Sequence, residues 1–84
     1  MRILHIVRAF EDVRALTMAA AQTVDHDVSL LLLHEAAGEA PRFPGAVYTC
    51  REDVERLGLQ PGTGALDYGQ MVDELAAQDR VVCW

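Results

Sequence analysis

Cys50 is the residue of this sequence best placed to carry out chemistry. It lies in the segment "VYTCREDVERLGL", residues 47–59, where an apolar run ends and a charged segment with helical spacing begins. This pattern predicts a strand-to-helix junction. The free N–H groups of a helix start stabilise a thiolate, and the thiolate is the nucleophile in sulfur transfer. A small packed hydrophobe is the alternative interpretation, and Glu52 and Asp53 in the first helical turn would repel a thiolate.

Arg8 and His34 follow the first two predicted strands, so both are expected at the same edge of the sheet as Cys50. In a 2-1-3 strand order, Arg8 lies on the strand next to Cys50, about 4.8 Å away. Arg8 would then be within reach of Cys50, to offset the acidic residues or to help bind an anionic sulfur species, although an ordinary surface arginine is the preferred interpretation. His34 would lie two strands from Cys50, about 10 Å away, which is too far for a direct thiol–imidazole pair.

Other candidate residues give weaker signals. His5, His26 and His34 have no regular ligand spacing, so no metal site is expected. No segment has both the glycine count and the basic residue of a phosphate-binding loop, so no cofactor is expected. Cys83 lies in the short apolar run "RVVCW", which predicts a packed and unreactive thiol. Trp84 is expected to dock either on a neighbouring subunit or on the protein's own sheet edge.

Short apolar runs alternate with helical patterns along the whole chain. This alternation predicts an α/β domain with a mostly parallel sheet of four or five strands and helices on both faces. Residues 3–7 and 28–33 are almost continuously apolar, which predicts that they are the inner strands. The other predicted strands are 44–50, a brief one at 65–68, and 80–84; the predicted helices are 11–24, a short turn at 34–40, 51–58 and 68–78.

Composition limits the possible classes of protein. The 84 residues predict one small domain, residues 1–84, and the hydrophobic content of 51% favours a subunit interface. The net charge of −6 argues against direct binding to nucleic acid, and no basic block suits a membrane surface. There is no signal-peptide pattern and no apolar run long enough to span a bilayer. Two free thiols then predict a reduced, cytoplasmic protein.

In the order and spacing of its segments, the chain resembles the DsrE/DsrF/DsrH–TusBCD sulfur-relay family, and most of all its DsrH/TusB branch. The resemblance covers nearly the whole chain. The most specific part is an aspartate–tyrosine pair, an amphipathic helix and a short strand that ends on Trp84. The segments that carry it are "ILHIVR", "HDVSLLLLHEA", "VYTCREDVERLGL" and "LDYGQMVDELAAQDRVVCW".

The resemblance implies a small three-layer DsrE-like, or flavodoxin-like, fold that acts as one subunit of a hetero-oligomer. Its partners would be DsrE/TusD-like and DsrF/TusC-like subunits, together with a sulfur donor and an acceptor protein. Such complexes pass persulfide sulfur, either for 2-thiolation of the tRNA wobble uridine or for dissimilatory sulfur oxidation. Purified alone, the chain is expected to form a homo-oligomer.

The resemblance leaves the role of Cys50 open. Many chains of the TusB branch have no cysteine at this position. The DsrE/TusD branch keeps its active cysteine between a strand and a helix, with a glycine eight residues on, here Gly58. Three hypotheses follow: a sulfurtransferase subunit with Cys50 as its persulfide carrier, a structural subunit without chemistry, or an unrelated small α/β binding module that oligomerises.

Overall fold

The structure, a computed structural model, describes residues 1–9, 14–39 and 41–84. The described strands form one all-parallel, five-stranded sheet, which confirms the predicted α/β fold. The predicted helix over 11–24 is seen from Arg14, and its first turn lies outside the described residues. In chain order the elements are β1 (Arg2–Val7), α1 (Arg14–Gln22), β2 (Asp27–Leu32), the 3-10 helix η1 (His34–Gly38), β3 (Ala46–Cys50), α2 (Arg51–Arg56), β4 (Ala65–Leu66), α3 (Tyr68–Ala76) and β5 (Arg80–Cys83).

The strand order is β4-β3-β2-β1-β5. Both β1 and β2 are inner strands, as their apolar character predicted. The expected 2-1-3 arrangement is wrong, because β2 and not β1 lies next to β3. The reason lies in the connections: α1, η1 and α2 each carry the chain one strand further in the same direction, and only α3 brings it back across the sheet.

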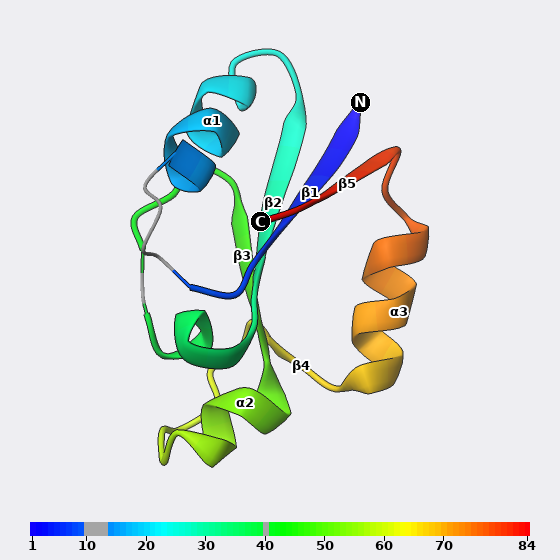
Figure 1. The fold of residues 1–84 in the computed structure, drawn as a ribbon. Helices are drawn as coiled ribbons and strands as arrows, with labels where there is room; N and C mark the ends of the chain where they lie inside the picture. Colours follow the sequence, from blue (N-terminus) through cyan, green and yellow to red (C-terminus); the bar gives the residue numbers. More distant parts are fainter. Residues whose placement is uncertain (10–13, 40) are drawn as a thin grey trace.

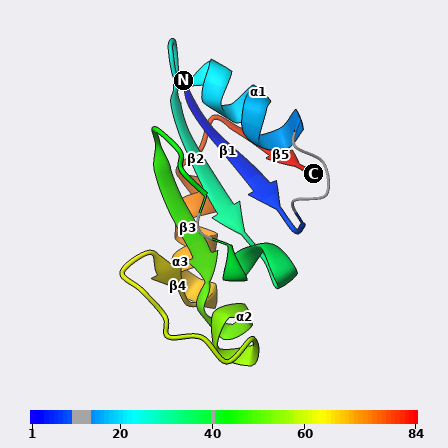
Figure 2. The ribbon, with the colours of Figure 1, turned by 90° about the vertical axis from the view of Figure 1, so that its left-hand side faces the viewer.

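Helices cover the two faces of the sheet unequally. In Figure 1 the sheet is seen almost edge-on, with α1 and η1 on one side and α3 on the other. Figure 2 shows β1, β2 and β3 running in the same direction, with α2 beyond their carboxyl ends. Reversal of the chain direction explains this layout, because right-handed crossovers in opposite directions fall on opposite faces.

The main core lies between the sheet and α1 with η1. On the opposite face, Leu4 and Leu31 are buried, yet α3 has no buried residue of its own. Because β2 is covered on both sides, its residues are buried without interruption from Val28 to Leu32, and all of them except Ser29 are apolar. The buried cluster on the α1 face comprises Ile3, Val7, Ala15, Ala19, Val28, Leu30, Leu32 and Ala36.

Two glycines are required by the backbone around β3 and α2. At Gly45, before β3, an added Cβ would lie 2.0 Å from the carbonyl oxygen of Val28, so only glycine lets the strands approach. Gly58 has φ 77°, a left-handed conformation that favours glycine, and it follows α2 where the sequence predicted the helix to end.

Candidate functional site

Cys50 occupies the predicted junction. It is the last residue of β3 and the N-cap of α2, with extended backbone angles of φ −77° and ψ 117°. Its register partner on β4 is Leu66. The side chain is only 8% exposed, so the thiol is more enclosed than the sequence suggested.

A crevice of about 290 Å³ gives access to Cys50. It lies between the carboxyl ends of β3 and β4, where α2 leaves one strand and α3 leaves the other toward the opposite face of the sheet. In open parallel sheets, such a divergence of adjacent connections is where ligands bind. We call it the Cys50 crevice; its lining residues are Cys50, Arg51, Glu52, Glu55, Leu66, Asp67, Tyr68 and Met71.

Asp53 links neighbouring elements next to Cys50 through hydrogen bonds. Its carboxylate accepts a hydrogen bond of 2.8 Å from the backbone N–H of His34 and one of 3.2 Å from Arg56. The hydrogen bond from the His34 backbone is the largest cause that lowers the pKa of Asp53, and Arg56 and Cys50 add to it against the effect of burial. Asp53 is therefore ionised at neutral pH and joins the ends of β2 and β3 to α2.

His34 adopts a backbone conformation that residues other than glycine rarely adopt. Its φ is 52°, directly after the end of β2 and at the start of η1. This turn is the one whose N–H bonds to Asp53. The hydrogen bond therefore helps to hold a strained residue in place beside the Cys50 junction.

Charges around the Cys50 crevice are mostly negative. Glu52, Glu55 and Asp67 face one basic side chain, Arg51, which pairs with Glu55 at 3.3 Å. The helix that begins at Cys50 has only six residues, so its dipole is small. This environment gives little help to a small anion.

Arg8 does not lie beside Cys50, contrary to expectation. It follows β1, which is separated from β3 by β2. Its Nε instead lies 3.4 Å from the backbone carbonyl oxygen of Trp84, next to β5. His34, which was expected to be the distant residue, is the first residue of η1 and follows β2, the strand next to β3. The single error in strand order exchanged the places of these two residues.

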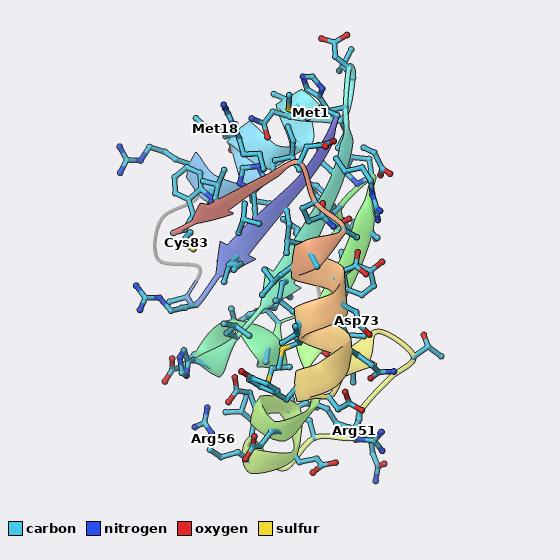
Figure 3. All side chains as sticks on the ribbon, turned by 90° about the vertical axis from the view of Figure 1, so that its right-hand side faces the viewer. Met1, Met18, Arg51, Arg56, Asp73 and Cys83 are labelled. Carbon is cyan, nitrogen blue, oxygen red and sulfur yellow. The ribbon has the colours of Figure 1, made fainter. Side chains whose placement is uncertain are left out.

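Cys83 is exposed on the edge strand β5, so the prediction of a packed thiol is wrong. Figure 3 shows it on β5, well away from Arg51 and Arg56 on α2. Residues on β5 alternate, with Val82 and Trp84 packed against the core while Cys83 points to the other face. At an edge strand that no helix covers, an apolar run does not bury every side chain.

Trp84 docks on the protein's own sheet, one of the two alternatives that the sequence left open. Its backbone N–H donates to the carbonyl oxygen of Ile6 at 2.9 Å, and its indole Nε1–H donates to His5 Nδ1 at 2.9 Å. His5 is completely buried and its Nε2 lies 2.6 Å from Oε1 of Gln22. No local pattern in the sequence pairs His5 with Trp84, because the two residues lie 79 positions apart.

A second crevice, of about 430 Å³, lies on the other face of the same two strands. Successive side chains along β3 and β4 point to opposite faces of the sheet, which explains why there are two crevices. Val47, Thr49 and Ala65 face the second crevice. Cys50 and Leu66 face the first. Apolar side chains dominate its walls. No polar group in it has a chemical role that the structure makes evident.

Within the described ranges, no group of three or more histidine, cysteine or acidic side chains is arranged to hold a metal ion. None of the described helices is long and apolar enough to cross a membrane. Comparison of the chain with protein-family models, curated proteins and solved structures finds no match in any of the three.

Proposed function

We propose that this chain is a subunit of a sulfur-relay complex and that Cys50 carries the sulfur as a persulfide. The observation that carries the proposal is the position of Cys50 in a crevice at the point where the sheet's connections diverge. The resemblance to the DsrH/TusB branch supports a place in such a complex, and the chemistry is supported by the position of Cys50, which is similar to that of the active cysteine in the DsrE/TusD branch. Arg8 has no part in it, because it lies beside Trp84.

Sulfur transfer at Cys50 would be a thiol–persulfide exchange. The Cys50 thiolate attacks the outer sulfur of a donor persulfide, a new S–S bond forms at Cys50, and the donor's own S–S bond breaks. The donor leaves as a thiolate and takes up the proton that Cys50 gave up, so no oxidant or reductant is needed. Asp53, an ionised carboxylate close enough to Cys50 for the thiol to lower its pKa, is the group through which this proton would pass.

The proposed setting is a cytoplasmic hetero-oligomer with DsrE/TusD-like and DsrF/TusC-like subunits. The pathway would be either tRNA wobble-uridine thiolation or dissimilatory sulfur oxidation. A net charge of −6 favours contact with the RNA through partner proteins and not directly. A chain that assembles with such partners but takes up no sulfur would be a structural subunit.

Filling the Cys50 crevice tests this proposal. Met71 lines the crevice, whereas its neighbour Val72 is 45% exposed on the same helix. We expect Met71→Trp to slow sulfur loading from a protein persulfide by at least about tenfold, or about 1.4 kcal/mol in the barrier. Val72→Trp should load at the normal rate. Equal loading by both variants, with folding verified by circular dichroism, would show that sulfur does not enter through this crevice.

A further inference from the structure

His5 is a buried ionisable side chain that the proposed sulfur chemistry does not use. Its ring lies between α1 and β5, bonded to Gln22 on one side and to Trp84 on the other. The indole N–H can only donate, so His5 Nδ1 must be the acceptor. The proton of the neutral ring is therefore on Nε2, which donates to the Gln22 carbonyl oxygen. Both ring nitrogens are satisfied in this one tautomer.

The two rings meet edge to edge. The ring planes differ by 24° and the ring centroids are 6.0 Å apart, while the hydrogen-bonded nitrogens, Trp84 Nε1 and His5 Nδ1, are only 2.9 Å apart. A cation–π attraction requires a cation over the ring face, so this geometry offers none to a charged histidine. The contact depends on His5 being neutral.

Strand β5 has few other attachments. It has four residues, lies at the edge of the sheet, and only Val82 within it is even half-buried. Besides its pairing with β1, it is held where Trp84 packs on the core and where Arg8 bonds the Trp84 carbonyl. The indole–imidazole hydrogen bond is thus the one side-chain bond that ties the end of β5 to the buried core among the described residues.

A second proton on His5 would go to Nδ1, where it would face the indole N–H donor directly. The described groups that face the ring offer no compensation: α1 presents the neutral Gln22, β2 presents Leu30, and β5 presents Val82 and Trp84. Among the described residues, no ion pair or hydrogen bond joins His5 to a carboxylate. Charging the ring therefore breaks the bond to Trp84 and puts an unpaired charge in the core.

We propose that His5 and Trp84 form an acid-sensitive latch that holds β5 on the sheet. At neutral pH the latch is closed. At acid pH, where a charged imidazole has no lone pair left for the Trp84 indole N–H, the hydrogen bond is lost and β5 detaches before the rest of the sheet. Detachment of β5 exposes the edge of β1 and the core residues that Trp84 covers. This inference stands independently of the sulfur chemistry.

The latch can be followed directly, because Trp84 is the one tryptophan of the chain. We expect its emission to shift to longer wavelength as the pH is lowered from about 8 to about 5. Hydrogen exchange over the same range should show loss of amide protection in β5 while β2 stays protected. Variants His26→Gln and His34→Asn, at the two exposed histidines, should behave like the wild type.

Replacement of His5 gives the decisive comparison. His5→Gln keeps an amide that can accept from Trp84 and donate to Gln22 but cannot take up a proton in this range. It should keep blue-shifted emission and a protected β5 at the lower pH. If that variant does not fold, NMR titration of the wild-type His5 ring replaces it. The latch is excluded if the ring gains its proton without change in β5, or if β5 and β2 lose protection together.

Discussion

The backbone N–H of His34, at the start of η1, donates a hydrogen bond of 2.8 Å to the carboxylate of Asp53 in the first turn of α2. The same carboxylate accepts a hydrogen bond of 3.2 Å from Arg56. One acidic side chain thus joins the turn that follows β2 to the helix that follows β3, next to Cys50. Asp53, and not Arg8, is the charged side chain fixed beside the Cys50 junction.

Replacing Asp53 should destabilise the protein in a pH-dependent way. Asp53→Asn removes the charge from these hydrogen bonds, and we expect a loss of about 1–3 kcal/mol in unfolding free energy at neutral pH. Because the pKa of Asp53 is lowered from 3.8 in the folded state, its contribution is present above that value and is lost as the pH falls through the folded pKa. Urea denaturation at neutral and at acid pH measures the loss of unfolding free energy and its dependence on pH.

The matched control for Asp53 is Glu52→Gln, since Glu52 is exposed in the same helical turn. It should change stability by no more than about 0.5 kcal/mol at any pH. A difference between wild type and Asp53→Asn that stays constant from neutral pH into strong acid would contradict the proposed ionised carboxylate.

Gly45 should tolerate no side chain. An added Cβ would lie 2.0 Å from the Val28 carbonyl oxygen and 2.8 Å from the Phe43 ring, so Gly45→Ala must push β3 away from β2. We expect a loss of about 2 kcal/mol or more in unfolding free energy. At Gly62 an added Cβ would meet no atom within 4 Å, so Gly62→Ala should leave stability unchanged or slightly raised. Equal effects of the two substitutions would refute the close approach.

The start of α3 depends on Asp67. Its side chain accepts the backbone N–H of Gln70 at 2.8 Å, and the Gln70 side chain accepts the backbone N–H of Asp67 at 2.9 Å, which is a complete capping box. Since α3 has no buried residue, this cap matters more than it would for a well-packed helix. We expect Asp67→Ala to cost about 0.5–2 kcal/mol and to reduce helix content measured by circular dichroism.

The control on the same helix is Asp73→Ala, an exposed position beyond the first turn. It leaves the cap intact and should change both quantities little. If Asp73→Ala were as costly as Asp67→Ala, surface charge and not capping would account for the effect.

Much of the fold could be predicted from the sequence because the signals are local. The apolar runs of β1 and β2 indicated buried inner strands, and Gly58 marked the end of α2. Strand order could not be read in this way. It depends on whether successive crossovers continue in one direction or reverse, and short connections such as η1 carry no local pattern that decides between them.

The site was predicted only in part for the same reason. Cys50 was placed correctly at its junction, since both flanking elements have clear patterns. Its burial, and the exposure of Cys83, depend on which helix lies over which strand. The bond from Trp84 to His5 joins the two ends of the sequence. Asp53 could be placed in the first turn of α2, but its bond to the His34 N–H comes from a different element and has no local signal in the sequence.

The most direct test of the proposed function is to find which cysteine takes up sulfur. The folded wild-type chain is treated with a protein persulfide, and the added sulfur atom is located by mass spectrometry of its peptides, alongside Cys50→Ser and Cys83→Ser. We predict that sulfur is found on Cys50, that Cys50→Ser abolishes loading, and that Cys83→Ser loads normally despite the exposure of Cys83 in the wild type. Sulfur on Cys83 alone, or on neither cysteine with partner subunits present, would contradict the proposal.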